Sequence, residues 1–340
     1  LTVFQRTPNF SVPAKNAPLD PNWVEEYKQD YRKHRDDYKH GRVSSFGDLM
    51  VPEEDRMITE DMILEKPIEE VHETLERFWG YGGARFIGTY VDTMISEEAN
   101  KVVADFVRDK IRSTVKDPQL ADKLCPTSHP IGTKRICVDS DYFDTYNRDN
   151  VSLVDISEHP LETITQKGLR TSEQDYEFDI LVLATGFDAM TGTLSRMNIT
   201  GAAGKPLNDK WEAGPRTYLG LGIHEFPNLF LVTGPGSPSV LSNMIVSIEQ
   251  HVDFITDMIK YMKENDYEIF EPDLSAEDAW VDHVNEVAAG TLFPKAGSWY
   301  MGANIPGKPR VFMPYAGGVG PYRELCDEIV EKGYEGFQFS

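Results

Sequence analysis

The chain is organised around residues 228–251, which read NLFLVTGPGSPSVLSNMIVSIEQH. The apolar run 229–232 predicts a short buried strand, and the Gly-Pro-Gly turn at 234–236 permits a sharp bend and close approach of a ligand. Apolar residues then recur at helical spacing, and they predict a helix with the buried stripe Ile245, Ile248, Val252, Ile255, Ile259 and Met262. A strand, a glycine turn and a helix N-terminus favour an electron-rich ligand, because free N–H groups point outward there. Ser239 occupies the third glycine position of the dinucleotide fingerprint, so the ligand stays open.

Length and charge limit the class of protein. The chain has 340 residues, enough for two domains, and a formal net charge of −22. This charge argues against nucleic acid or an anionic membrane surface as a partner, since both attract a basic face. No apolar run approaches the roughly 18 residues of a membrane-spanning helix. Three scattered cysteines predict free thiols in a reducing cytoplasm, and no metal site is expected, because no Cys or His pair has metal-ligand spacing.

Helical and strand patterns occupy different parts of the chain. Residues 20–125 predict a helical unit, within which 42–66 have weak patterning and predict an irregular loop. Four runs predict strands, the last of them buried: 1–4, 151–156, 161–165 and 176–185. Helices together with buried apolar strands indicate an α/β fold.

Two short cationic segments stand out in this acidic chain. Lys134-Arg135 follow a glycine, and Arg6-Thr7 follow the first predicted strand. A solvated basic turn is one interpretation of Lys134-Arg135, and anion recognition is the other, with Lys as a point charge on a phosphate and Arg as a fixed cation near developing negative charge. An Arg and a hydroxyl at a strand end suit a ribose 2′-phosphate, which distinguishes NADP from NAD. Trp299 is either a core residue or a stacking surface in a pocket wall.

Several segments, taken in order, resemble one family, the flavin-dependent Baeyer–Villiger monooxygenases. The resemblance covers nearly the whole chain and is nearest to the branch containing phenylacetone and steroid monooxygenases. The segments that carry it are 4–9, 132–135, 147–151, 179–187, 234–250 and 298–310.

The resemblance implies two dinucleotide-binding domains, for FAD and NADP, with a helical insertion. Residues 1–19 and 126–187 would be the C-terminal part of the NADP-binding domain, 20–125 the insertion, and 188–340 the C-terminal part of the FAD-binding domain. The implied site residues are Arg6, Thr7 and Lys134 at the NADP 2′-phosphate, Arg135 as the catalytic residue at NADP, Trp299 closing over NADP, Met244 at FAD, and Ser239, Val240 and Leu241 in the ketone pocket.

The implied reaction consumes NADPH and O2. NADPH would reduce FAD, O2 would form a C4a-peroxyflavin, and attack on a cyclic or aryl ketone would give a lactone or ester. The permanent charge of Arg135 would favour the deprotonated peroxide. Two alternatives stay open from the residues: a flavin monooxygenase that hydroxylates nitrogen or sulfur, and a non-catalytic fragment that has lost its cofactor sites.

One departure from the family pattern is large. The sequence contains no complete Gly-x-Gly-x-x-Gly motif; the nearest matches are at 234–239 and 80–85. We therefore expect a C-terminal portion of the enzyme, inactive alone, that needs the N-terminal part to complete both cofactor sites. Alone it is expected to bind FAD poorly and to expose sheet edges.

Overall fold

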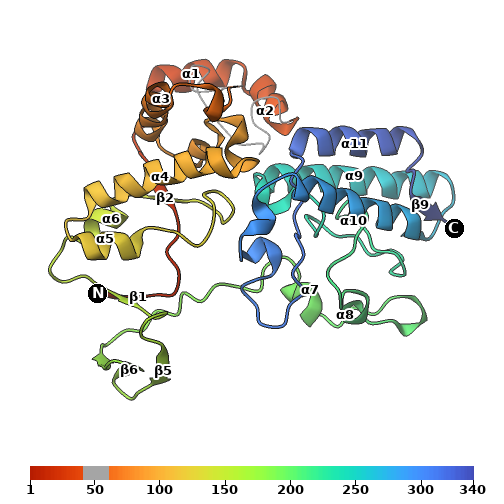
Figure 1. The fold of residues 1–340 in the computed structure, drawn as a ribbon. Coiled ribbons are helices and arrows are strands. Elements are labelled where there is room, and N and C mark those ends of the chain that lie inside the picture. Colours follow the sequence, from red (N-terminus) through yellow and green to blue (C-terminus); the bar gives the residue numbers. More distant parts are fainter. Residues whose placement is uncertain (41–60) are drawn as a thin grey trace. The chain divides into compact units, whose positions relative to one another are not determined.

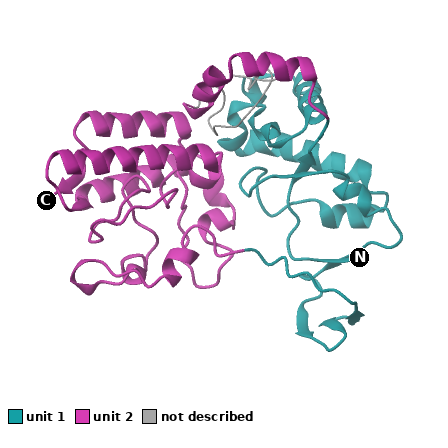
Figure 2. Ribbon diagram, turned by 180° about the vertical axis from the view of Figure 1, so that it is seen from behind, with its two compact units in different colours: residues 1–17, 58–186 teal, residues 18–57, 187–340 magenta. Residues whose placement is uncertain are grey.

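The computed structural model describes residues 1–40 and 61–340, which group into two compact units. One unit consists of Leu1–Ala17 and Ile58–Gly186, the other of Pro18–Met57 and Phe187–Ser340 (Figure 2). Each unit combines helices with short strands, so the α/β class is confirmed. The assignment of segments to NADP, to FAD and to an insertion stays a prediction. Of the predicted loop over 42–66, residues 42–60 lie outside the described part, and Ile63–Glu65 form a 3-10 turn.

The first unit contains two pairs of parallel strands. They are β1 (Thr2–Gln5) with β4 (Ser152–Asp155), and β2 (Ser11–Pro13) with β3 (Cys137–Asp139). The strands expected at the start of the chain and within 151–156 are therefore confirmed. The carboxyl ends of a parallel pair lie at one edge, and here the Ile156 N–H donates to the Gln5 carbonyl at 2.9 Å. Residues that follow β1 thus emerge at the edge where α/β proteins bind ligands.

The helices of this unit form one core with the strands (Figure 1). They are α3 (Ile68–Tyr81), α4 (Glu97–Thr114), α5 (Pro118–Leu124) and α6 (Tyr142–Thr145), with 3-10 turns at Ala84–Gly88 and Val91–Met94. Helix α4 begins where the Ser96 side chain accepts a hydrogen bond from the Ala99 N–H at 3.3 Å. Such a cap stabilises a helix start because it satisfies a free donor. Buried Val103 and Ile111 of α4 belong to the same apolar cluster as Val12 of β2.

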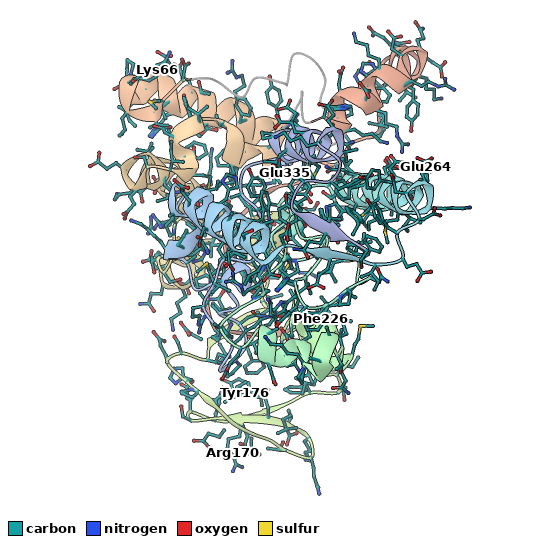
Figure 3. The ribbon with its side chains drawn as sticks, turned by 90° about the vertical axis from the view of Figure 1, so that its right-hand side faces the viewer. Lys66, Arg170, Tyr176, Phe226, Glu264 and Glu335 are labelled. Carbon is teal, nitrogen blue, oxygen red and sulfur yellow. The ribbon has the colours of Figure 1, made fainter. Side chains whose placement is uncertain are left out.

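A three-stranded antiparallel sheet follows β4. It consists of β5 (Leu161–Ile164), β6 (Gly168–Thr171) and β7 (Asp175–Glu177), which confirms the strand expected within 161–165. Arg170 on β6 and Tyr176 on β7 mark this sheet in Figure 3. The Tyr176 ring meets the Phe4 ring edge-on with centroids 5.1 Å apart, which ties the sheet to β1.

The prediction of a buried strand over 176–185 is wrong for the residues that follow β7. Residues 178–187 form no strand, and Ile180, Val182 and Phe187 have exposed fractions of 80%, 78% and 89%. A strand is stable only when a neighbouring backbone completes its hydrogen bonds. Within the described residues, no strand pairs with this segment. Its apolar composition alone therefore does not bury it.

The second unit is mostly helical (Figure 1). Its helices are α1 (Pro21–Gln29), α2 (Tyr31–Lys39), α7 (Gly192–Arg196), α8 (Leu207–Lys210), α9 (Met244–Glu264), α10 (Leu274–Ala289) and α11 (Val319–Glu331), and β8 (Phe270–Pro272) pairs with β9 (Phe337–Phe339) in antiparallel fashion. Helix α2 is tied to this unit by ion pairs of Arg35 and Lys39 with Glu249 of α9, and by Arg323 of α11, which donates to the Lys39 carbonyl at 3.1 Å.

The stretch 228–251 differs from its prediction in two ways. Residues 229–232 form no strand: the Leu231 N–H donates to the Leu221 carbonyl at 2.8 Å, but no ladder follows, and Val232 is exposed. Helix α9 is present, but the predicted stripe is wrong. Only Met262 of that stripe is buried; the buried side chains are Val246, Ser247, Gln250, His251, Phe254, Met258 and Met262. The buried face includes polar residues because several of them have hydrogen-bond partners inside the unit.

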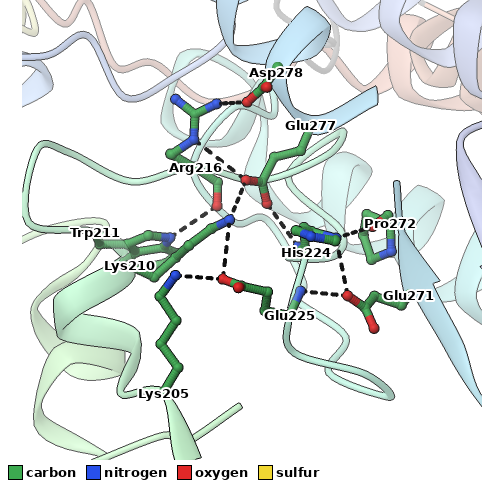
Figure 4. A network of polar contacts seen from close by, with 10 residues as sticks. All are labelled: Lys205, Lys210, Trp211, Arg216, His224, Glu225, Glu271, Pro272, Glu277 and Asp278. Atoms are coloured by element: carbon green, nitrogen blue, oxygen red, sulfur yellow. Dashed lines mark hydrogen bonds and ion pairs between the residues drawn. The ribbon is translucent and has the colours of Figure 1, made fainter. Parts of the chain in front are cut away.

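A buried charge network joins the segment 205–225 to α10 (Figure 4). Glu277 of α10 is fully buried, and the Lys210 Nζ lies 2.8 Å from its Oε1. The Arg216 Nε lies 3.5 Å from the same oxygen, and the His224 N–H donates to Oε2 at 2.8 Å. Several donors around one carboxylate offset the cost of removing its charge from water.

Candidate functional site

The first candidate site lies where β1 ends. Arg6 and Thr7 follow the strand directly, and both are exposed at the carboxyl edge of the β1–β4 pair. The neighbouring segment 129–135 carries the other predicted cations, Lys134 and Arg135. Strand ends of this kind present side chains and free backbone groups to ligands.

A buried asparagine anchors the segment that carries these cations. The Asn100 side chain of α4 accepts from the Ile131 N–H at 3.0 Å and donates to the Ile131 carbonyl at 2.9 Å. Gly132 follows with φ +85°, where a Cβ would lie 2.5 Å from the Met94 sulfur. Glycine is therefore required here both by conformation and by space. The turn holds Lys134 in a defined place.

Two residues outside the predicted set fix the backbone at Arg135. The Asn9 side-chain amide donates to the Arg135 carbonyl at 2.9 Å. Asn9 Oδ1 lies 3.2 Å from Nε2 of His129, which is buried. His129 and Asn9 are functional candidates that sequence reasoning missed. A lone histidine gives no signal by its spacing, although this one stands only five positions before Lys134.

The electrostatics of this site favour an anion. Burial, and then the charge of Arg6, lower the pKa of Lys134. Burial, followed by the charges of Lys134 and Arg108, lowers the pKa of His129 to about 4. Within the part of the chain that the structure describes, neither Arg6 nor Lys134 has an ion pair with a carboxylate. Two neighbouring cations without a protein anion gain Coulomb energy from a bound phosphate.

The glycine turn in the second unit has a different character. The Thr233 N–H donates to His251 Nδ1 at 2.8 Å, the Gly236 N–H to the Met313 carbonyl at 2.7 Å, and the Ser237 N–H back into the turn. A 3-10 turn at Ser239–Leu241 then separates the glycines from α9. The predicted strand, turn and helix N-terminus are not formed as one unit, because these donors face inward. The expectation of an outward-facing N–H cradle at this turn is wrong.

Close packing fixes the glycine turn. Gly236 has φ +85°, and a Cβ there would lie 3.0 Å from the Thr217 hydroxyl and 3.1 Å from Trp280 Nε1. Trp280 also donates to the Gly236 carbonyl at 3.0 Å, and Thr217 donates to the Pro235 carbonyl at 2.6 Å. Helix α10, through Trp280, and the loop that carries Thr217 thus pack closely around the turn.

Two of the predicted pocket residues share one apolar cluster with Trp299, the residue expected to close over NADP. Val240, Leu241 and Trp299 pack against a cluster whose buried members are Ala288, Tyr300 and Phe312. Ser239 is buried and its hydroxyl donates to the Thr233 carbonyl at 3.3 Å, whereas Met244 is half-buried at the start of α9. A separate cavity of ≈ 300 Å³ includes Asp188, Trp211 and Lys308 in its lining. None of the described residues lining that cavity belongs to the predicted pocket.

Known proteins with similar sequence and structure point to one family. A Baeyer–Villiger monooxygenase of Pseudooceanicola batsensis is 39% identical over 338 residues, which are 98% of this chain and 59% of that protein. The phenazine N-monooxygenase PhzNO1 of Lysobacter antibioticus is 37% identical over 346 residues, covering 99% and 60%. The structure of an oxidised steroid monooxygenase bound to NADP matches with a TM-score of 0.90 at 42% identity, covering 99% and 62%. The chain is a homologue of the Baeyer–Villiger monooxygenases.

The chain spans about three fifths of the length of these relatives. No protein-family model matches it. None of the described helices is both long and apolar enough to cross a membrane.

The site residues expected from the likeness to Baeyer–Villiger monooxygenases divide between the two units. The first unit holds Arg6, Thr7, Lys134 and Arg135, and the second holds Ser239, Val240, Leu241, Met244 and Trp299. Within each unit the structure brings members together: Lys134 lies within the electrostatic reach of Arg6, and Trp299 shares a cluster with Val240 and Leu241. The roles of these residues stay predictions.

Proposed function

We propose that the complete protein is an NADPH- and O2-dependent flavoprotein monooxygenase that converts cyclic or aryl ketones into lactones or esters. The observation that carries this proposal is the pair of cations Arg6 and Lys134 at a strand edge, in a protein of net charge −22. Homology to Baeyer–Villiger monooxygenases supports the reaction class. When bound, FAD would supply the oxygen-activating chemistry and NADPH the reducing equivalents.

The residues of the first unit fit the 2′-phosphate of NADP. A phosphate between Arg6 and Lys134 would offset their repulsion and the burial that lowers the pKa of Lys134. The Thr7 hydroxyl, exposed beside Arg6, is a further donor. Trp299 is the residue that we assign to closing over NADP, on the likeness to Baeyer–Villiger monooxygenases; within its own unit it packs against the cluster of Ala288, Tyr300 and Phe312.

Arg135 supplies the permanent cation of the proposed active site. A guanidinium stays charged at every working pH, so it stabilises negative charge that develops during oxygen transfer without losing a proton. The bond from Asn9 to its carbonyl fixes where its side chain starts. Ser239, Val240 and Leu241 would form the wall of the ketone pocket, which keeps water from the reacting carbonyl.

The second unit fits the flat ring of FAD better than its phosphates. Met244 and exposed Val232 flank the glycine turn with apolar surface, while the turn's N–H groups at 233, 236 and 237 already have partners. Gln250 on the buried face of α9 has no hydrogen-bond partner for its amide within the described residues, so it retains a donor and an acceptor. We propose that the phosphate-binding glycines come from the N-terminal part that such enzymes possess. We also propose a cytoplasmic location, in line with three free cysteines.

Replacing Lys134 tests the cofactor assignment. Lys134→Ala should reduce the preference of the complete enzyme for NADPH over NADH by about 10- to 100-fold, the usual worth of a charged hydrogen bond. Steady-state kcat/KM with each nucleotide measures it. Lys167→Ala is the matched control, because Lys167 is an exposed lysine of the β5–β7 sheet that pairs with Glu177. An unchanged preference for NADPH over NADH in Lys134→Ala would show that the 2′-phosphate does not bind at this site.

Hydroxylation of nitrogen or sulfur is a second candidate reaction, and one observation supports it. A phenazine N-monooxygenase is 37% identical, close to the 39% of the Baeyer–Villiger relative, so identity does not separate the two chemistries. Product analysis with NADPH and 18O2 separates them: one labelled oxygen in an ester or lactone supports ketone oxidation, whereas only N-oxide or sulfoxide products would replace it. If the purified complete protein shows no flavin absorbance and forms no product, the protein is the non-catalytic alternative.

A further inference from the structure

His129 has hydrogen bonds that fit both of its protonation states. Its Nε2 lies 3.2 Å from Asn9 Oδ1, and its Nδ1 lies 3.1 Å from the Ser128 hydroxyl. Since the Asn9 amide nitrogen donates to the Arg135 carbonyl, Oδ1 faces His129 and accepts from Nε2–H. In the neutral ring Nδ1 then accepts from the Ser128 hydroxyl. When the ring gains a proton, that hydroxyl turns and accepts from Nδ1–H, so no bond is lost.

The other deeply buried histidine of this protein behaves differently. His251 Nδ1 accepts from a backbone N–H, that of Thr233, which has no lone pair to accept a proton in return. Protonation of His251 at Nδ1 would place that N–H directly against the Thr233 N–H, with no acceptor between them. A protonated His129 therefore keeps acceptors for both of its ring N–H groups, whereas a protonated His251 would have no acceptor at Nδ1 among the described residues.

The charges that face His129 are all positive, and one of them is open to an anion. Lys134 and Arg108 act on the ring, while the edge of Phe10 packs against it with centroids 5.5 Å apart. Arg108 is already paired, because it lies 2.7 Å from Asp105 and donates to the Pro126 carbonyl. Lys134 has no such ion pair within the described residues. An anion bound at Lys134 would thus offset one of the two positive charges that act on His129.

We propose that His129 is a positioning residue of the anion site and also its third, proton-dependent cation. Through Asn9 it fixes the Arg135 backbone, and a phosphate dianion bound between Arg6 and Lys134 makes its protonation easier. By linkage, the protonated protein binds that phosphate more tightly by the same factor. This inference rests on the proposed 2′-phosphate site.

The test uses the complete protein and two probes, adenosine 2′,5′-bisphosphate and adenosine 5′-monophosphate. The ring signals of His129 are followed by NMR between about pH 3.5 and 7, a range that includes the lowered pKa of about 4 and a rise above it. The ring is identified by its proximity to the Phe10 ring protons. In the free protein the ring should titrate with its lowered pKa of about 4, and with the bisphosphate this pKa should rise by about one unit, a tenfold coupling. The monophosphate should leave it unchanged.

Two variants separate the proton from the hydrogen bond. In His129→Gln the side-chain amide nitrogen can still donate to Asn9 but does not titrate. Bisphosphate affinity near neutral pH should therefore persist, whereas wild type should bind progressively more tightly than this variant as the pH falls toward the pKa of His129. In His129→Leu the donor is lost, and affinity should fall about threefold to tenfold at every pH. A merely structural histidine would make the two variants alike.

The possible results distinguish this inference from the function on which it rests. If the bisphosphate binds no more tightly than the monophosphate, the proposed 2′-phosphate site fails. If it binds more tightly but the His129 signals do not move, the site stands and the proton linkage is overturned. A bisphosphate-specific shift of His129, abolished by Lys134→Ala, supports both.

Discussion

At the scale of single residues, His251 shows how a buried side chain acquires one fixed protonation state. The ring is fully buried on α9 and accepts from the Thr233 N–H, so its Nε2 carries the hydrogen and points at Tyr322 Oη, 3.0 Å away. Tyr322 in turn donates to the Leu219 carbonyl at 2.5 Å. This relay connects α9, α11 and the glycine turn through neutral groups. Burial, with a smaller contribution from Arg323, lowers the pKa of His251 to about 4.

The pH dependence of stability follows from that shift. The ordinary pKa of 6.5 applies in the unfolded chain, so between pH 6.5 and about 4 the unfolded state binds the proton and the folded state does not. The stabilisation is complete above pH 6.5 and is lost as the pH falls toward 4, by about 3 kcal/mol in total. Urea unfolding at several pH values measures it as the difference between wild type and His251→Leu.

His251→Leu itself should cost about 2–4 kcal/mol at neutral pH, because the Thr233 N–H and the Tyr322 hydroxyl lose a buried partner. His72→Gln, at an exposed position of α3, should change stability by about 0.5 kcal/mol or less and leave the pH dependence intact. Equal slopes against pH in wild type and His251→Leu would contradict the assignment.

At the scale of elements, α9 shows that a regular apolar pattern does not by itself predict which face of a helix is buried. Its sequence offers two candidate faces, and the stripe at 245, 248, 252, 255, 259 and 262 has the more regular apolar pattern. The structure buries the neighbouring face, where Phe254 and Met258 pack in the core of the second unit and His251 completes its relay. Ile245, Val252 and Ile259 remain exposed. The buried face of the helix is thus the one that combines the core residues Phe254 and Met258 with the hydrogen bond from the Thr233 N–H to His251.

Two adjacent substitutions test this rotation. Met258 is fully buried and Ile259 is 50% exposed, although both are large apolar residues of one helix. Met258→Ala should therefore lower the free energy of unfolding by about 2–5 kcal/mol through a lost core contact and a cavity. Ile259→Ala should cost about 1 kcal/mol or less. Urea denaturation of this 340-residue chain gives both values, and a larger loss for Ile259→Ala would restore the stripe predicted from periodicity.

At the scale of the whole molecule, distant segments meet through polar groups as well as through apolar cores. Glu277 brings together α10, the loop at 216–224 and Lys210, which are up to 67 positions apart in the chain (Figure 4). Lys210 is only 8% exposed at its side chain, and Glu277 at 2.8 Å is the nearer of its two carboxylate partners among the described residues, the other being Glu225 at 3.9 Å. A buried ion pair need not exceed an apolar substitute in stability, but breaking it leaves an unpaired buried charge.

Glu277→Gln should therefore be destabilising, by about 3–5 kcal/mol, because it removes the nearer carboxylate partner of buried Lys210 and leaves, within the described part of the chain, only Glu225, 3.9 Å away. Glu264→Gln is the matched control, since Glu264 is exposed at the end of α9 (Figure 3), and it should change stability by about 0.5 kcal/mol or less. Thermal and urea unfolding measure both. If Glu277→Gln is as stable as wild type, the network does not bind these segments together.

The sequence by itself determined the features that depend on near neighbours in the chain. The helix starts at Ser96 and Asp117 follow from local capping, and β1 and β4 from short β-branched and apolar runs. The cations at 6 and 134 and the ordered motifs that resemble those of Baeyer–Villiger monooxygenases are likewise local. Such patterns carry over to the fold because capping, turns and charge need no distant partner.

Only the tertiary structure decided which groups meet across the chain. The apolar runs at 176–185 and 229–232 are predicted as buried strands, yet among the described residues only the start of the first, within β7, pairs with another strand. The neutral state of His251 and the proton-tolerant surroundings of His129 depend on partners 18 and 120 positions away. The physical reason is that burial, strand pairing and pKa depend on long-range neighbours, which composition and periodicity do not specify.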